Sequence, residues 1–305
     1  MPREVGWEWD TTGWWVKPRN SREVMAMIGS IGVYSTGQQF AWRGMASADY
    51  PLVSSLHRHV GGSEADVRAA ELEMIKEARE WGLGTHPTGK VDDLQLLSDL
   101  QHYGIATRLI DVSSNPMTAL WFACQQPRDS RVAKSGLLLA TNITGWRRLS
   151  TVADPTGVYQ GQSGTQQGAR LDSALQHPEP FVVESASPND RLRAQEGFFI
   201  SGRIPDPDET IMPGGFSIGP VTPFKSIQIE HAPGVPTELR NRLMEPRGTG
   251  APRALPFVAM IIPAGVKSRL LKYLQGSYNR SARQLFPDYE GYRQFGAHAA
   301  RRLQP

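Results

Sequence analysis

Residues 99–123 place a run of polar and ionisable side chains between two strongly apolar segments, and this arrangement limits what the chain can fold into. The polar members are His102, Tyr103, Thr107, Arg108, Asp111, Ser113, Ser114 and Asn115. A buried polar group without a partner costs roughly 1–3 kcal/mol by mutational estimates. Such a cluster is therefore either a fully hydrogen-bonded internal network or a ligand site, and we expect a ligand site.

Composition excludes several classes of protein. The chain has 305 residues, of which 39% are hydrophobic, enough for a core in one large domain or two small ones. A net charge of +3 is too small to indicate nucleic-acid binding by itself. The single cysteine, Cys124, excludes an internal disulfide framework and a thiolate zinc site. Without a secretion signal, or an apolar run near the ~20 residues of a membrane span, we expect a cytoplasmic protein with no membrane contact.

Hydrophobic spacing and capping residues predict alternating helices and strands. Helices are expected over 22–29, 63–81, 92–103, 116–124, 266–275 and 289–303, with a helix or turn over 51–60. Strands are expected over 39–42, 107–112, 136–142, 180–184, 196–201, 226–230 and 257–262. Ser21 and Ser63 are the predicted N-caps of their helices, and Gly104 the predicted stop signal. Interleaved short elements without a repeat predict an α+β fold, a single domain of short mixed strands with packed helices.

Two parts of the chain depart from this pattern of regular helices and strands. Residues 1–20 form a tryptophan-rich N-terminal segment, which either packs its indoles on the core or serves as an exposed lid or partner-binding segment. The remaining residues, 21–305, are expected to form one domain. Glycine- and proline-rich stretches predict loop insertions near 143–179 and 202–224, including an irregular loop over 159–168.

Four separated segments of the chain resemble the FRG domain family, which is named for a Phe-Arg-Gly motif. They are residues 40–45 with 50–58, residues 101–111 with 115–123, residues 189–199, and residues 285–291. Trp42 stands where the family has its name-giving Phe, and Val112-Ser113 replaces the usual Trp-Thr after the aspartate. The resemblance extends over about residues 20–296.

The order of these motifs is remotely similar to that of ADP-ribosyltransferases. In those enzymes a strand ends in Arg-Gly, a hydroxyl-bearing strand-to-helix segment follows, and a later strand carries Glu or Gln. The matching positions here are Arg43-Gly44, Ser113-Ser114 and Gln195-Glu196. The resemblance implies an ADP-ribosyltransferase-like core and NAD as substrate. It also implies a protein or nucleic-acid acceptor, and a toxin or phage-defence role with a neutralising antitoxin partner.

The chemistry of ADP-ribose transfer suits these residue types. Cleavage of the nicotinamide–ribose bond develops positive charge on the sugar, which a nearby carboxylate stabilises. Glu196 is the first residue of the strand expected over 196–201, and Gln195 directly precedes it. Because side chains alternate along a strand, only one of the two is expected to face the pocket. The resemblance supports Gln195 and the chemistry favours Glu196, so both stay candidate catalytic residues together with Arg43.

The candidate residues for binding NAD are Arg43, Gly44, His102, Tyr103, Gly104, Thr107, Arg108 and Ser113. The planar fork of Arg43 suits a diphosphate or ribose, and Gly44 would let a ligand approach the backbone. Tyr103 could stack on nicotinamide while His102 bonds a ribose hydroxyl. Each has a structural alternative: Arg43 could pair with a carboxylate, and Ser113 could cap the following helix.

Other chemistries lack support in the sequence. His57 and His59 point apart on a helix, so no metal site is expected. Neither a Gly-x-Ser-x-Gly elbow nor a phosphate-binding loop with its Lys-Ser/Thr is present. The alternative function is a non-catalytic module that binds a nucleotide or nucleic acid in the same pocket. A third alternative is an interaction scaffold whose polar cluster is hydrogen-bonded internally. For Asp111 itself we expect a structural role in a network that holds the strand.

Overall fold

The computed structural model of the chain describes residues 14–34, 37–50, 52–86, 89–127, 132–150, 171–177, 179–185, 187–204 and 257–296. Its strands are β1 (Trp14–Val16), β2 (Phe40–Met45), β3 (Thr85–His86), β4 (Gly89–Lys90), β5 (Ile110–Ser113), β6 (Gly136–Asn142), β7 (Arg147–Ser150), β8 (Phe181–Glu184), β9 (Gly197–Ser201) and β10 (Phe257–Ile262). Its helices are α2 (Ser21–Tyr34), α3 (Ser55–Val60), α4 (Glu64–Glu80), α5 (Asp93–His102), α6 (Pro116–Ala123), α8 (Asp190–Ala194), α10 (Ala264–Tyr278), α11 (Ala282–Leu285) and α12 (Tyr289–Phe295).

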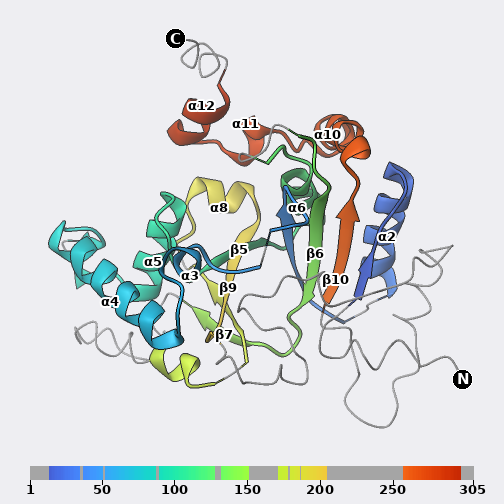
Figure 1. Cartoon of the computed structure of the whole chain (residues 1–305). Helices are drawn as coiled ribbons and strands as arrows, with labels where there is room; N and C mark the ends of the chain where they lie inside the picture. Colours follow the sequence, from blue (N-terminus) through green and yellow to red (C-terminus); the bar gives the residue numbers. More distant parts are fainter. Residues whose placement is uncertain are drawn as a thin grey trace, which may run out of the picture.

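Eight of these strands form one mixed sheet in the order β1-β10-β6-β2-β5-β9-β8-β7 (Figure 1). Within it, the pairs β1–β10 and β7–β8 at the two edges are parallel, and the inner pairs are antiparallel. Helices α3, α4 and α5 lie toward the β7 end of the sheet and α2 toward the β1 end, while α10, α11 and α12 lie along one edge of the molecule (Figure 1). The α+β class predicted from the sequence is confirmed.

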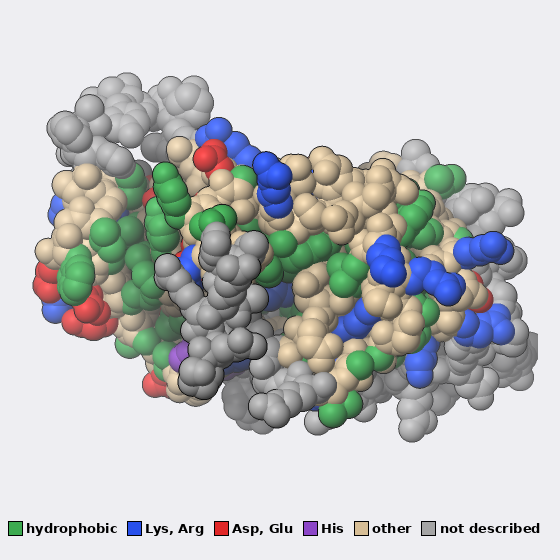
Figure 2. Space-filling view, turned by 90° about the horizontal axis from the view of Figure 1, so that it is seen from above, with side chains coloured by type: hydrophobic (Ala, Val, Ile, Leu, Met, Phe, Trp, Pro, Cys, Tyr) green, Lys and Arg blue, Asp and Glu red, His purple; other side chains and the backbone are tan. Residues whose placement is uncertain are grey.

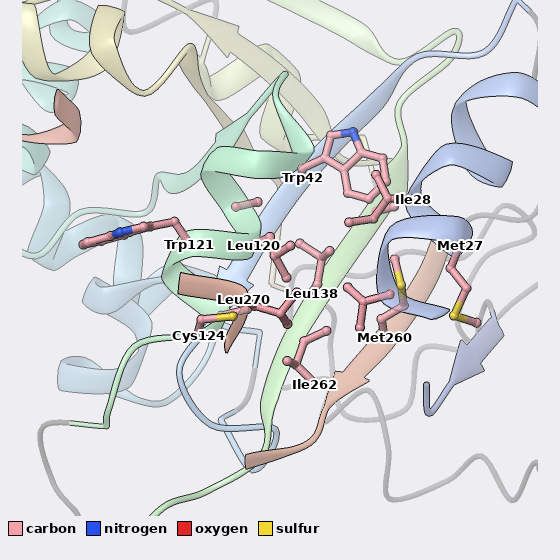
Figure 3. Packing of buried hydrophobic residues seen from close by; sticks show 14 of the residues in the cluster. Met27, Ile28, Trp42, Leu120, Trp121, Cys124, Leu138, Met260, Ile262 and Leu270 are labelled. Atoms are coloured by element: carbon pink, nitrogen blue, oxygen red, sulfur yellow. The ribbon is translucent and has the colours of Figure 1, made fainter. Parts of the chain in front are cut away.

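The core follows the two-residue period of the central strands. On β6, Leu138 packs with α2, α6 and α10 on one face of the sheet, whereas Leu137 and Leu139 belong to the cluster on the other face. Met260 on β10 joins the first cluster, beside Leu138 (Figure 3). A further cluster covers the β8–β9 end with apolar side chains of α4 and α5. Both faces of the sheet are therefore buried, which explains why β6 and β10 read as continuous apolar runs.

The sheet opens in its middle. Strands β2 and β6 pair at six positions, from Phe40 to Met45, but β2 and β5 pair only where Trp42 lies opposite Ser113. Beyond that position the two strands separate, and their facing backbone groups do not continue the ladder. This separation creates the space in which the candidate site lies.

Elements with strong local signals match the predictions. Helix α4 has Ser63 as its N-cap in a capping box with Asp66, and β6 spans the predicted residues. Helix α5 begins after Asp92 and ends before Gly104, which has a positive φ of 83°. The predicted helix over 116–124 and the strand over 257–262 are also confirmed.

Other predicted boundaries were wrong for local reasons. The side chain of Asn20, not Ser21, accepts the hydrogen bonds of the first backbone N–H groups of α2. Strand β5 begins at Ile110, because the Thr107 hydroxyl accepts the N–H of Leu109 in a local turn that replaces the first ladder bonds. Strand β9 begins only at Gly197.

Several features were missed or lie outside the described residues. The sequence analysis did not predict α8, which follows its N-cap Asn189, or β7, which lies within the predicted 143–179 insertion. The predicted loop over 159–168, the strand over 226–230, most of the 202–224 insertion, Trp7 and Trp9 lie outside the described residues. Helix α12 ends at Phe295, and residues 297–303 of the predicted helix are not described. Of the described helices, none has the length and apolarity needed to cross a membrane.

Candidate functional site

A pocket of about 380 Å³ lies where β2 and β5 separate. Small-molecule sites typically occupy roughly 300–1,000 Å³. Its wall combines β2, the end of α5, β5, α6, the α8–β9 segment and the residues around α11 and α12. The lining residues used below are Trp42, Arg43, Gly44, Gln101, His102, Tyr103, Gly104, Asp111, Ser113, Thr118, Arg191, Gln195, Phe286, Glu290 and Gln294.

Most of the predicted site residues meet in this pocket, and three do not. Arg43, Gly44, His102, Tyr103, Gly104, Ser113 and Gln195 line it. Thr107, Arg108 and Glu196 are outside its lining. The pocket thus brings together residues whose positions in the chain differ by more than 150, while separating the neighbours Gln195 and Glu196.

Arg43 comes from the middle of β2, beside the opening of the sheet. Its Nη1 donates a hydrogen bond to the backbone carbonyl of Asp111, which the separated strands leave free to accept it. Its Nε is buried and has no hydrogen-bonding partner in the part of the chain that the structure describes. Burial lowers the pKa of Arg43 below its ordinary value. The charge of Asp111 opposes this, and the charge of Arg58 lowers the pKa further. The guanidinium of this pocket residue therefore keeps a buried donor, Nε, without a partner among the described residues.

Asp111 contacts this guanidinium through its backbone carbonyl, and its carboxylate acts on Arg43 through its charge. The side chain is exposed and lines the pocket, and its Oδ2 accepts a hydrogen bond of 2.8 Å from Gln101 Nε2. Gln101 Oε1 in turn accepts the Thr107 hydroxyl at 2.8 Å. Thr107 therefore acts on the pocket through Gln101 rather than by contact. The internal network expected for Asp111 runs through this carboxylate, and Asp111 also lines the cavity.

Packing is sufficient to explain why position 44 is a glycine, while ligand approach at this pocket residue stays a prediction. A Cβ atom on Gly44 would lie 1.7 Å from the carbonyl oxygen of Ala119 and 2.6 Å from the backbone nitrogen of Ala123. The backbone of α6 therefore fills the space that a side chain at this position would need. Gly44 supports the site by letting α6 approach β2.

Thr118 is a pocket residue that the sequence analysis did not single out. It is fully buried on α6, and its hydroxyl has no hydrogen-bonding partner among the described residues. Because an unpaired buried hydroxyl costs free energy, its position on the pocket wall points to a ligand partner.

His102 and Tyr103 form the rim at the end of α5. Tyr103 is 80% exposed, and its ring meets that of His102 edge-on with 5.0 Å between centroids. His102 Nε2 lies 3.9 Å from Asp288 Oδ2, and Arg191 donates two hydrogen bonds of 2.8 and 3.0 Å to the same carboxylate. Burial lowers the pKa of His102 below 6.5, and the charge of Arg191 adds to this against nearby aspartates. The lowered pKa therefore favours the neutral form of His102 near pH 7.

Ser113 and Ser114 hold a turn and do not cap a helix. The N-cap of α6 is Asn115, with Pro116 in the first turn. Ser113 Oγ donates to the carbonyl of Gln195 at 2.7 Å, and the backbone N–H of Ser114 donates to the carbonyl of Glu196 at 2.9 Å. The start of α6 is thereby tied to the α8–β9 turn across the sheet.

Gln195 and Glu196 occupy this turn and not a strand, which corrects the alternation expected from the sequence. Gln195 is the C-cap of α8, and its Nε2 donates to the carbonyl of Leu285 at 3.0 Å. Glu196 has a φ of 49°, which is uncommon for a residue other than glycine. Its Oε1 accepts hydrogen bonds from Arg280 at 2.6 Å and from Asn115 at 2.9 Å.

Arg108 belongs to a separate buried charge network. Its Nε donates to both carboxylate oxygens of Glu71, at 2.8 and 2.9 Å, and its Nη2 donates to Glu64 at 3.0 Å. Burial would lower the pKa of Arg108, but these two carboxylates outweigh it and raise the pKa above its ordinary value. Arg108 therefore links β5 to α4 and has no contact with the pocket.

The chain beyond residue 280 supplies a wall that the sequence analysis did not place at the site. Phe286, Glu290 and Gln294 line the pocket from this segment. Only residues 285–291 had been noticed, through the motif resemblance, and no local pattern indicates what such residues face.

Seen from the side of α10–α12, basic side chains gather over the half of the molecule that carries α2 and α10, and acidic ones toward α4 (Figure 2). Within the described residues no group of three potential metal ligands occurs.

One family model matches a stretch of the chain that contributes several residues to this pocket. Residues 38–131 match the FRG domain, a stretch that includes Arg43, Gly44, the end of α5, Asp111 and Thr118. Gln195 and the residues beyond 280 lie outside the match. Comparisons with curated proteins and with solved structures found no match.

Proposed function

We propose, from the premise that residues 38–131 form an FRG domain, that the pocket binds NAD and that the protein transfers its ADP-ribose to an acceptor. One observation carries this proposal. All four segments with the motif resemblance contribute to one pocket, through Arg43, Asp111, Gln195 and Phe286 among others. Two polar atoms there, Arg43 Nε and Thr118 Oγ1, lack a protein partner among the described residues.

The binding roles follow from these groups. A guanidinium with a free donor suits a phosphate or ribose oxygen, so Arg43 is the proposed anchor of the diphosphate-linked sugar. The Thr118 hydroxyl offers a further hydrogen bond from α6. Tyr103 offers an exposed aromatic face for a base or nicotinamide ring at the rim, and His102 a neutral imidazole for a ribose hydroxyl.

The transfer step needs a carboxylate close to the bound sugar. The bond between the nicotinamide nitrogen and ribose C1′ breaks, and its electron pair leaves with nicotinamide. A lone pair of the acceptor then bonds to C1′, and the acceptor gives its proton to a base. Asp111 is the proposed carboxylate, because it lines the pocket next to Arg43 whereas Glu196 does not line it.

The structure does not narrow the sequence-based hypotheses about the acceptor and any partner, so we propose them unchanged. The acceptor is a protein or a nucleic acid. Because the reaction would consume the host's own NAD, the proposal includes a toxin or phage-defence role and a neutralising partner.

The test measures nicotinamide release from NAD and label transfer into a cell lysate, with binding of NAD followed by calorimetry. Asp111→Asn is expected to lower turnover by about 100-fold or more with NAD affinity nearly unchanged. Arg43→Gln is expected to weaken NAD binding by about tenfold or more, since it removes a charge-assisted donor. Glu73→Gln on the exposed side of α4 is the matched control and should change neither.

A second function is favoured by one specific observation. Glu196, the acid that the motif order offers for catalysis, is held by Arg280 and Asn115 outside the pocket lining. A pocket without that carboxylate suits a module that binds a nucleotide without cleaving it. Binding of NAD or another nucleotide without nicotinamide release would select this function, and absence of any NAD binding would overturn the first proposal.

A further inference from the structure

We infer that Gln195 and Glu196 are positioning residues that clamp residues 280–295 over the pocket, and that this segment takes part in ligand binding. Residues 280–295 are called the C-terminal wall below. The clamp itself stands on the contacts of the folded chain. Its effect on NAD binding rests on the proposed function. To that function we add that the C-terminal wall contacts the bound NAD and helps to select it.

The C-terminal wall closes one side of the pocket. Phe286 lies between α11 and α12 and presents an aromatic ring, and α12 adds the carboxylate of Glu290 and the amide of Gln294. Together they offer one apolar surface, one acceptor group and one side chain that both donates and accepts. A ligand bound at Arg43 would therefore be enclosed by side chains that lie outside the FRG match.

The clamp consists of two neighbouring side chains with separate targets. Gln195 Nε2 donates to the carbonyl of Leu285 at the end of α11. Glu196 forms an ion pair of 2.6 Å with Arg280, which precedes α11. One turn thus holds the C-terminal wall at both ends of α11.

The turn formed by Gln195 and Glu196 is also hydrogen-bonded to residues 113–115, which connect β5 to α6. Ser113 and Ser114 bind the carbonyls of Gln195 and Glu196, and Asn115 Nδ2 donates to the Glu196 carboxylate at 2.9 Å. Glu196 adopts a left-handed backbone conformation within these contacts. The turn is therefore held on both sides, by the start of α6 and by the C-terminal wall.

Arg191 adds a contact that reaches α12. It binds Asp288 through two hydrogen bonds, and Asp288 is the N-cap of α12, accepting the N–H of Gly291 at 2.6 Å. The Arg191 guanidinium also lies over the Phe286 ring, 5.0 Å from its centroid. Helix α8 and the turn after it thus contact the C-terminal wall from Arg280 to the start of α12.

Aromatic side chains also pack the C-terminal wall against α6. The Phe286 ring centroid lies 5.9 Å from those of Trp121 and Phe122 and 4.9 Å from that of Phe295. Trp121 belongs to the same buried cluster as Trp42 and extends from the side of α6 that faces away from Trp42 (Figure 3). The wall is therefore packed against α6, and the polar clamp sets its position along that surface.

These contacts distinguish positioning from catalysis for Glu196. Its carboxylate has two donors from the protein and does not line the pocket. A catalytic carboxylate would have to touch the reacting sugar, whereas Glu196 touches Arg280. Loss of either partner of this ion pair should therefore have the same effect on the pocket.

The experiment compares Glu196→Gln, Arg280→Gln and the double variant with wild type. Amide hydrogen exchange of residues 282–296 reports the position of the C-terminal wall without any need for activity, and NAD kinetics report KM and kcat separately. Partly exposed ion pairs contribute about 0.2–1 kcal/mol, which corresponds to a change of up to about fivefold. Both single variants should raise exchange and KM by about two- to fivefold with kcat nearly unchanged. The double variant should be no worse than either, and Arg280→Lys should restore most of the KM.

Arg283→Gln is the matched control, because Arg283 is exposed on α11 and lies outside both the clamp and the pocket lining. A loss of kcat of about 100-fold or more in Glu196→Gln, with Arg280→Gln behaving like wild type, would make Glu196 catalytic and overturn the inference. Unchanged exchange over 282–296 in all variants would overturn the clamp. If wild type does not bind or cleave NAD, the proposed function fails, and the exchange measurement still decides on the clamp.

Discussion

Arg43 on β2 and Thr118 on α6 each bury a polar atom without a protein partner among the described residues, and both side chains line the same pocket. Unpaired buried polar atoms are rare in folded proteins because each costs roughly 1–3 kcal/mol. Both residues belong to the wall of one cavity, so this wall is incompletely hydrogen-bonded. Because the two atoms are themselves closed off from solvent, a bound ligand would reach them after a small side-chain movement.

Thr118→Val should therefore separate stability from binding. Replacing an unpaired buried hydroxyl by a methyl group of similar size is expected to leave the free energy of unfolding unchanged or to raise it by up to about 1 kcal/mol. Ligand affinity should fall by about three- to tenfold. Urea unfolding and calorimetric titration with NAD measure the two effects.

Thr107→Val is the matched control for that variant. Thr107 is equally buried, but its hydroxyl donates to Gln101 and accepts the N–H of Leu109. The same substitution there should lower the free energy of unfolding by about 1–3 kcal/mol, because it leaves those groups unpaired. Equal destabilisation by both substitutions would show that Thr118 has a partner in solution.

Gly44→Ala tests whether the glycine serves packing. The added Cβ would overlap the Ala119 carbonyl, so α6 would have to move away from β2. We expect a loss of about 3 kcal/mol or more in the free energy of unfolding, or failure to fold. Gly265→Ala, where a Cβ would meet nothing within 4 Å, should be nearly neutral. A stable Gly44→Ala protein that had lost only ligand binding would instead support direct ligand approach at Gly44.

His102 predicts a specific acid dependence of stability. Its pKa is lowered in the folded state, mainly by burial and then by Arg191, so the unfolded chain binds the proton more readily. Stability contributed by neutral His102 is therefore complete above pH 6.5 and is lost as pH falls from 6.5 toward the folded-state pKa. The charges that act on it are Arg191, Asp288 and Asp111 from other elements and Asp99 from its own helix, α5.

The measurement is the free energy of unfolding between pH 7.5 and 5. His102→Gln should flatten the decrease in this interval, whereas His59→Gln on the exposed end of α3 should leave it unchanged. Asp288 titrates in a lower interval, because hydrogen bonds from Arg191 and Gly291 outweigh burial and lower its pKa below 3.8. An unchanged pH dependence in His102→Gln would contradict the lowered pKa.

Several site residues were identifiable from the sequence because they lie next to elements with strong local signals. The end of α5 was predictable from Gly104, and this placed His102 and Tyr103 at a helix end. Arg108 shows the limit of such reasoning. It follows Thr107 directly, yet its side chain leaves the site for Glu71, more than 30 residues earlier in the chain.

The sequence by itself determined the α+β class, the elements with regular apolar spacing and caps, such as α4 and β6, and the polar segment that contributes to the pocket. Those features depend on interactions between residues close in the chain. Only the tertiary structure decided which polar groups face the ligand, because that depends on contacts across long separations. Arg43 and Asp111 are 68 residues apart, Ser113 and Gln195 are 82, and Gln195 and Leu285 are 90. The opening between β2 and β5 and the C-terminal wall arise from such contacts, which no local pattern records.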